Sequence, residues 1–330
     1  MTLANMMPRR YGGAIAQSWM QRFMDRKHIV FLKVAELGNV TAAAAELHIA
    51  QPSLTRAIAA LEDTFGAKLF IRQPRGMTLT DEGRVLHRHL REMEAVYQRA
   101  CRDVETVKRG YHQAINIGCG LTYQLLLMPE ILRRLWLEFP QSSFRVFTGS
   151  ADDHTRALQD GDLDFVITAA TDGVDDALVD VTRLCRIEHG VVHRPGVLPD
   201  IPDTEKMDLA ALDDKSWVLF QTEPQLKLSM ENRFLQLGLA PPRIALTTSS
   251  LQVGLELVAS NDMVMSAPTL LRDWLRARGY RLHATSVPIW ELDSGIAMLK
   301  TNRDHPVAEA LIGHAQELVR TLPAFSLGTT

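Results

Sequence analysis

Residues 40–80, VTAAAAELHIAQPSLTRAIAALEDTFGAKLFIRQPRGMTLT, contain the pattern that decides the fold of the N-terminal part of this chain. Thr41 is a good N-cap for an alanine-rich first helix. Pro52 suits the first turn of a second helix, because the N–H it lacks would have no helical partner there. The second helix has an apolar stripe at steps of four, three and four residues, formed by Leu54, Ile58, Leu61 and Phe65. The stretch therefore predicts two short helices joined by a tight turn.

Several of the remaining side chains of this helix pair are polar and point away from the apolar stripe. Hydroxyl, amide and guanidinium groups near the N-terminus of a recognition helix are suited to base edges and phosphates. The groups that we expect to contact DNA here are Thr41, Gln51, Pro52, Ser53, Thr55 and Arg56. The alternative is that they form an ordinary solvated helix face.

A basic hairpin follows the helix pair. Residues 67–71 and 77–80 are strand-like, and the turn between them carries Arg72 and Arg75 without an acidic residue. A wing with a basic tip is suited to phosphate or minor-groove contact. Arg72 and Arg75 complete the predicted DNA-binding residues.

The order of these residues resembles the N-terminal domain of LysR-type transcriptional regulators, a resemblance that covers roughly residues 24–320. It is carried by one set of matching segments: Gln51-Pro52-Ser53-Leu54-Thr55-Arg56, Leu61-Glu62, Phe65-Gly66, Leu69-Phe70, Arg72, Leu79-Thr80 and Gly83. The resemblance implies an N-terminal all-α winged helix-turn-helix, a long linker helix, and a C-terminal two-subdomain α/β domain like a periplasmic binding protein.

Composition fits a globular protein of the cytoplasm. The chain has 330 residues, of which 46% are hydrophobic and 23% charged. No run approaches the roughly 18 to 20 apolar residues that span a bilayer, so we expect no membrane partner. Cys101, Cys119 and Cys185 lie far apart, which fits unlinked thiols in a reducing compartment.

Charge separates the two ends of the chain. Residues 24–110 hold 14 Lys and Arg against 11 Asp and Glu, whereas residues 111–330 hold 19 against 28. A mildly basic N-terminal part next to an acidic C-terminal part is typical of a DNA-reading domain attached to a domain that does not touch DNA.

A long helix over about residues 80–109 is predicted between these parts. Its apolar residues keep a 3.5-residue spacing, a seam formed by Leu86, Leu90, Met93, Tyr97, Ala100, Val104 and Val107. Such a seam usually pairs with a second copy of the chain, which predicts a homodimer on a palindromic double-stranded operator. The resemblance implies that two dimers can also associate into a homotetramer. The alternative is a helix packed on its own domain.

From residue 111 onward, strands and helices alternate, which predicts a mostly parallel sheet covered on both faces and an α/β fold overall. The resemblance implies that a small-molecule effector lies between two subdomains. Hydroxyls, amides and glycines in loops after the strands favour an anion such as an organic acid. The predicted effector-binding residues are Gly120, Thr122, Ser150, Thr168, Gln221, Ser249 and Ser266. Capping of their own helices is the alternative role for these residues.

Other chemistries have weaker support in the sequence. Gly118-Cys119-Gly120 begins like a dinucleotide fingerprint, but Tyr123 stands at the third glycine position. The sequence has no HExxH, CxxC or GxSxG motif, so we expect no metal, no cofactor and no catalytic residues. Thiol-based redox sensing at Cys119 or Cys185 is an alternative to buried, unreactive cysteines.

Two functions follow, and they belong to different classes. The favoured one is a transcription factor in which an effector changes the arrangement of paired DNA-reading heads, with RNA polymerase as a further candidate partner. The other is a solute-binding or enzymatic α/β protein whose N-terminal helices only dimerise. The predicted domains are an N-terminal extension (1–23), a DNA-binding domain (24–81), a linker helix (82–110) and an effector-binding domain (111–323).

Overall fold

The chain forms two compact units, each described here by itself. The computed structural model describes residues 25–73, 76–108, 113–169, 178–199, 201–202, 205–220 and 224–322. The first unit contains the described residues up to Arg102 together with Gln159–Asp162, and the second contains the others. The predicted N-terminal extension, residues 1–23, lies outside the described residues.

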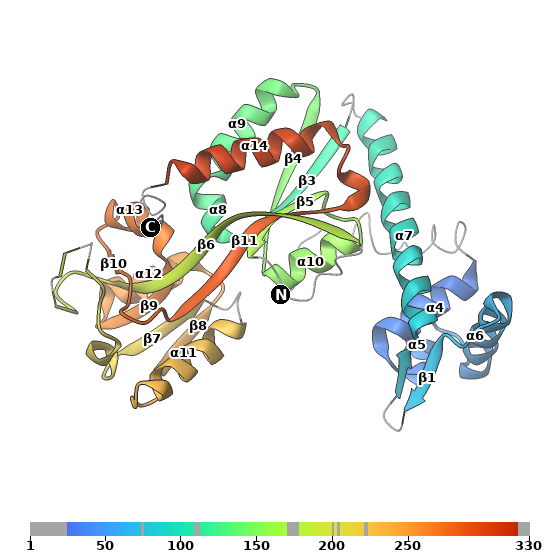
Figure 1. Ribbon diagram of the computed structural model, residues 1–330, viewed down its shortest axis with the longest axis horizontal. Helices are drawn as coiled ribbons and strands as arrows, with labels where there is room; N and C mark the ends of the chain where they lie inside the picture. Colours follow the sequence, from blue (N-terminus) through green and yellow to red (C-terminus); the bar gives the residue numbers. More distant parts are fainter. Residues whose placement is uncertain are drawn as a thin grey trace. The chain divides into compact units, whose positions relative to one another are not determined.

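The first unit contains a winged helix-turn-helix (Figure 1). Its elements are α4 (Arg26–Leu37), α5 (Val40–Glu46), α6 (Gln51–Phe65), β1 (Phe70–Gln73), β2 (Gly76–Leu79) and the first part of α7 (Asp81–Lys108). Leu54, Ile58 and Leu61 of α6 are buried in one core with residues of α4 and α5, as their spacing predicts. Phe65 is 52% exposed. It was wrongly predicted to face the core, because α6 ends there and Gly66 turns the chain away with φ 64°.

The seam predicted on α7 divides into two parts. Leu86 and Leu90 pack into the core of the winged domain, so there the helix packs on its own domain. Among the described side chains of the helix, the large hydrophobic ones that are exposed are Val85, Met93, Val96, Val104 and Val107. At 3.6 residues per turn these five positions lie within an arc of about 100°. The helix therefore presents an exposed apolar stripe that shares Met93, Val104 and Val107 with the predicted seam.

The second unit is built on one nine-stranded sheet. Its strands are β3 (Gln113–Cys119), β4 (Ser142–Thr148), β5 (Phe165–Ala169), β6 (Val179–His193), β7 (Ser216–Phe220), β8 (Arg243–Thr248), β9 (Met263–Pro268), β10 (Arg281–His283) and β11 (Trp290–Leu299). The strand order is β4-β3-β5-β11-β6-β9-β7-β8, and β10 also pairs with β6.

Two parallel groups of strands are joined by the long strands β6 and β11 (Figure 1). The group β4-β3-β5 and the group β9-β7-β8 are each parallel. β6 and β11 pair antiparallel with each other from Trp290↔His189 to Leu299↔Val179, and the register shifts between Ser294 and Gly295. The predicted two-subdomain α/β fold is confirmed. The prediction of a mostly parallel sheet needs a correction, because β6, β10 and β11 are antiparallel to their neighbours.

Helices cover both faces of the sheet, as the near-continuous apolar strands require. They are α8 (Leu121–Leu126), α9 (Met128–Glu138), α10 (Ala151–Gln159), α11 (Pro224–Gln236), α12 (Leu251–Ser260), α13 (Arg272–Arg276) and α14 (Pro306–Arg320), with short 3-10 turns η1 (Leu209–Leu212), η2 (Thr269–Leu271) and η3 (Lys300–Asn302). Because strand side chains alternate between faces, Trp217 and Leu219 pack with α11, whereas Val218 packs with α12.

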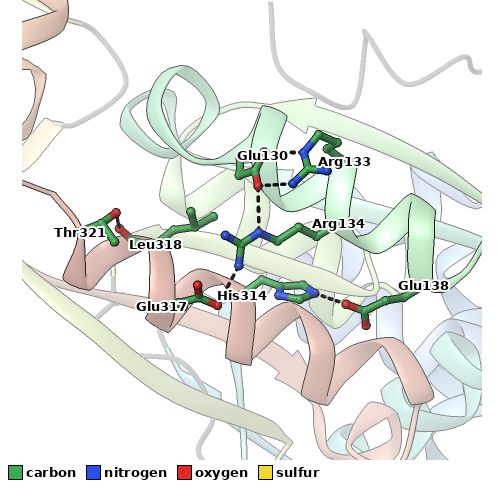
Figure 2. Close-up of polar contacts among 8 residues, drawn as sticks. All are labelled: Glu130, Arg133, Arg134, Glu138, His314, Glu317, Leu318 and Thr321. Carbon is green, nitrogen blue, oxygen red and sulfur yellow. Dashed lines mark hydrogen bonds and ion pairs between the residues drawn. The ribbon is translucent and has the colours of Figure 1, made fainter.

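Charged side chains join α9 to α14 at the surface (Figure 2). Arg134 donates to Glu130 at 2.9 Å within α9 and to Glu317 of α14 at 2.7 Å. His314 Nε2 lies 2.6 Å from a carboxylate oxygen of Glu138. Hydrogen bonds from Arg133 and Arg134 lower the pKa of Glu130 to about 2. Because exposed ion pairs contribute little to stability, these contacts mainly fix the alignment of two helices that already share a core.

Candidate functional site

The first helix of the helix-turn-helix is capped by Asn39. Its Oδ1 accepts the backbone N–H groups of Thr41 at 2.9 Å and Ala42 at 3.1 Å, and α5 begins at Val40. The prediction that Thr41 is the N-cap is therefore wrong by two residues, because Asn is the stronger cap and lies within reach of both amides. Thr41 is exposed in the first turn instead.

The turn between α5 and α6 is tightly hydrogen bonded. His48 has a left-handed backbone with φ 54°. The N–H of Ile49 donates to Ala44 at 3.0 Å and that of His48 donates to Ala45 at 3.2 Å. This is the Schellman arrangement that closes a helix C-terminus. It fixes where α6 starts, two residues later at Gln51.

One side of the N-terminal half of α6 is open to solvent, while the opposite side is in the core. Gln51, Pro52, Thr55 and Arg56 are exposed, and Ser53 is half-buried. The guanidinium of Arg56 donates to the carbonyl of Pro52 and to the hydroxyl of Ser53, both at 3.4 Å. Both acceptors are neutral, so the positive charge of Arg56 is not neutralised by these contacts. The predicted groove-facing residues thus lie together on one exposed surface.

The wing is a two-stranded hairpin with Arg72 near its tip. Phe70 pairs with Leu79, Arg72 with Met77 and Gln73 with Gly76. The side chain of Arg72 is exposed, and Arg75 lies outside the described residues. The N–H of Met77 donates to the carbonyl of Gly38 at 2.8 Å, which holds the hairpin against the end of α4.

Two residues at the base of the wing, Glu62 and Thr80, have contacts that the sequence did not predict. Glu62 is a buried carboxylate near the end of α6, and Thr80 lies immediately before α7. Both are hydrogen bonded to the segment between α6 and β1. Glu62 belongs to the Leu61-Glu62 segment of the family resemblance. An acidic residue on a helix ordinarily indicates a solvated position, so the sequence pattern did not predict this buried contact.

Three of the predicted effector-binding residues lie close to one another in the second unit. The N–H of Gly120 donates to the carbonyl of Ile167 at 2.8 Å. A Cβ added to Gly120 would lie 3.1 Å from the hydroxyl oxygen of Thr168. Thr122 lies in the first turn of α8, directly after Gly120. The ends of the parallel strands β3 and β5 thus bring Gly120 and Thr168 together, and Thr122 lies two residues after Gly120.

The other four residues are placed differently. The hydroxyl of Ser150 accepts the N–H of Asp153 at 3.1 Å and donates to its carboxylate at 2.8 Å, so it caps α10. Ser249 is exposed next to Ser250, whose hydroxyl caps α12. Ser266 lies inside β9 rather than at its end, and its hydroxyl is 3.1 Å from Nδ1 of the buried His189. Gln221 lies outside the described residues.

A small group of buried polar side chains lies around Tyr123 in the second unit. Burial raises the pKa of the Cys119 thiol well above its ordinary value, which disfavours the nucleophilic thiolate. The hydroxyl of Tyr123 contacts Ser294 and lies 3.2 Å from the sulfur of Cys185. Burial and then the neighbouring Cys185 also raise the pKa of Tyr123. The raised pKa of the Cys119 thiol fits the expectation of a buried, unreactive cysteine at that position, and Cys185 is buried as well.

Neither a metal site nor a membrane span is evident in the described ranges. No group of three or more His, Cys, Asp or Glu residues there is arranged to hold a metal ion. In that same part of the chain, no helix is both long enough and apolar enough to cross a bilayer.

Two family descriptions match the sequence. "Bacterial regulatory helix-turn-helix protein, lysR family" matches residues 26–84, and "LysR substrate binding domain" matches residues 108–320. Among curated relatives, the HTH-type transcriptional regulator GbpR of Azospirillum brasilense is 26% identical over 250 residues, which are 76% of this chain and 73% of the relative. The nitrogen assimilation regulatory protein nac of Escherichia coli is 35% identical over 113 residues, which are 34% of this chain and 37% of the relative.

Solved structures have a similar fold. Full-length CbnR complexed with its target DNA has a TM-score of 0.51 at 19% identity, covering 89% of this chain and 99% of that chain. A hydrogen-peroxide-bound mutant of OxyR from Corynebacterium glutamicum has a TM-score of 0.52 at 20% identity, covering 92% of this chain and 95% of that chain. At these identities the likeness concerns the fold alone.

Proposed function

This chain belongs to the LysR family of bacterial helix-turn-helix transcriptional regulators, and we propose that it regulates transcription in response to a small organic acid. In this proposal the acid binds in the second unit and changes the arrangement of paired DNA-reading heads. The observation that carries the DNA-reading part is the exposed N-terminal half of α6, whose opposite side is anchored in the core.

The exposed surface of α6 reads the major groove. Gln51, Ser53, Thr55 and Arg56 supply the donors and acceptors that base edges require, while Pro52 and Thr41 approach the backbone. Arg72 and Arg75 of the wing contact phosphates or the minor groove. Arg56 is the principal base-reading residue in this account, because its hydrogen bonds to neutral oxygens leave its charge available.

The exposed stripe on α7 pairs with a second copy of the chain. An apolar stripe of this length on a charged helix is typical of a helix that packs against a partner. The resulting homodimer binds a palindromic operator, and two dimers associate into a tetramer. A regulator of this kind works on DNA in the cytoplasm, and RNA polymerase is its further partner.

A carboxylate binds beside Gly120, Thr122 and Thr168. Two hydroxyls next to a glycine can donate to an anion, and the small glycine lets a ligand approach the backbone. Gln221 and Ser249 are further candidates. The hydroxyl of Ser150 caps its own helix, and that of Ser266 contacts His189. Because both hydroxyls have these structural roles, they are weaker candidates for effector contacts.

A thermal-shift screen of the full chain tests the effector class. Each small carboxylic acid is compared with its neutral amide at the same concentration. An acid at one hundred times its Kd stabilises the folded state by about 2.7 kcal/mol, which raises the Tm of a unit of this size by roughly 5–10 °C. Thr122→Val and Thr168→Val should reduce the shift. The organic-acid proposal would be refuted by acids and amides that shift the Tm equally, or by a panel in which only cations do.

A further inference from the structure

The carboxylate of Glu62 connects the DNA-reading helix to the base of the wing. Its Oε1 accepts a hydrogen bond from the backbone N–H of Leu69 at 2.9 Å, and its Oε2 accepts one from the Lys68 ammonium at 2.7 Å. The residue is only 9% exposed. Burying a carboxylate is unfavourable unless it is paired and hydrogen bonded, so this side chain is held at the contact by its partners.

The same two residues, Lys68 and Leu69, are bound from the other side by Thr80. The Thr80 hydroxyl donates to the carbonyl of Lys68 at 2.7 Å and accepts the N–H of Gly83 at 2.9 Å, which caps α7. The N–H of Thr80 donates to the carbonyl of Leu69 at 3.1 Å. A Cβ on Gly83 would lie 2.1 Å from that carbonyl, so the first turn of α7 lies directly against the segment.

We propose that Glu62 and Thr80 are positioning residues that lock the DNA-reading helix α6 to the linker helix α7, so that the direction of α7 determines where α6 meets the duplex. Lys68 and Leu69 connect the two helices, because they are hydrogen bonded to Glu62 of α6 and to Thr80 at the start of α7. The proposal rests on the proposed function, because it concerns how two linked heads reach two half-sites.

The length of α6 shows why this lock matters for the DNA. Gln51 lies eleven residues before Glu62, which is about 16 Å along a helix. A tilt of about 10° at Glu62 would move the Gln51 end by about 3 Å. One base step is about 3.4 Å, so a loosened lock lets each head reach neighbouring base steps. The loss should appear as relaxed spacing between half-sites, while the bases preferred within each half-site stay the same.

The experiment measures how well the full chain discriminates between operator spacings. Its own selected operator is compared with versions whose spacer is one base pair longer or shorter, in equilibrium binding at constant salt. The wild-type chain should prefer the selected spacing by tenfold or more. Thr80→Val and Glu62→Ala should reduce that preference to threefold or less. Thr80→Ser keeps the hydroxyl and Glu62→Gln keeps an acceptor for Leu69, so both should retain the wild-type preference.

Thr64→Val is the matched control, because it removes a hydroxyl of α6 that bonds only within its own helix, to Ala60 at 2.8 Å. It should leave the spacing preference unchanged. Circular dichroism and melting establish that each variant folds. Where Glu62→Ala does not fold, Thr80→Val decides, because loss of one N-cap removes only a small part of the stability of a domain.

Three outcomes overturn the lock. In one, Thr80→Val binds more weakly but keeps the wild-type spacing preference, which makes its role structural only. In another, Thr64→Val relaxes the spacing as much as Thr80→Val does. In the third, the wild-type chain binds DNA without any spacing preference. A wild-type chain that binds no DNA contradicts the proposed function itself, which distinguishes that failure from the other three.

Discussion

Two of the buried histidines, His154 and His189, should make the second unit sensitive to mild acid. Burial lowers the pKa of His189 from 6.5 to about 3 and that of His154 to about 4. Both rings are well enclosed, with His154 0% and His189 7% exposed. The unfolded chain therefore binds more protons than the folded chain as the pH falls below 6.5. The stability that these neutral imidazoles contribute is fully present above that pH and is lost progressively towards pH 4 and then pH 3.

The expected loss can be calculated from these values. At about pH 5 each unfolded imidazole is protonated, whereas each folded one is still neutral, and the difference is worth about 2 kcal/mol per histidine. The two together should lower the free energy of unfolding of this unit by about 4 kcal/mol between pH 8 and pH 5. That is a large share of the 5–15 kcal/mol typical of a folded domain.

Urea unfolding followed by tryptophan fluorescence measures this loss. Trp136, Trp217, Trp274 and Trp290 all belong to the second unit. His189→Asn removes one titrating group and should halve the loss to about 2 kcal/mol. His48→Asn, an exposed residue of the first unit, should leave the loss unchanged. The reasoning fails if the wild-type free energy is the same at both pH values, or if His189→Asn shows the full wild-type loss.

Three further outcomes are expected. Arg56→Ala should reduce discrimination between the operator and a mutated operator by about 1–3 kcal/mol. Arg75→Ala should instead weaken binding to all DNA sequences and flatten the salt dependence of binding. Equal loss of specificity from both variants would contradict this division of roles. Gly76→Ala should lower the free energy of unfolding in urea by about 2–3 kcal/mol, because φ is 147° and the added Cβ would lie 2.3 Å from a carbonyl oxygen. Gly66→Ala should lower it by only about 1 kcal/mol, because φ is 64° but no atom lies within 4 Å of the added Cβ. Val96→Asp, in the exposed stripe of α7, should shift the chain towards monomer in analytical ultracentrifugation, and an unchanged dimer would exclude this stripe as the interface.

Local sequence patterns predicted the helix pair α5 and α6 and the turn between them well, because their geometry is set by neighbours in the chain. Pro52, the apolar spacing of α6 and the turn before it act within a few residues of one another. The error at Thr41 is also local, because the side chain of the nearby Asn39 accepts the N–H groups of the first turn.

The remaining differences arise from contacts that are distant in sequence. Leu86 and Leu90 fit a heptad seam, but they pack into the core of the winged domain. The hydroxyl of Ser266 is held by His189, which lies 77 residues earlier. The burial of Glu62 could not be predicted from its helix, because its partners Lys68 and Leu69 reach it only after the chain turns back at Gly66. Spacing along one segment cannot indicate which of these partners will be near.

The measurement that tests the central claim most directly is selection of binding sites by the full chain from random duplex DNA. If α6 reads bases and α7 pairs two heads, the enriched sequences will form an inverted repeat with half-sites about one or two helical turns apart. Arg56→Ala will then enrich a weaker consensus with the same repeat spacing. Recovery of no enriched sequence, or of a single unrepeated motif, would contradict the account of a paired DNA reader.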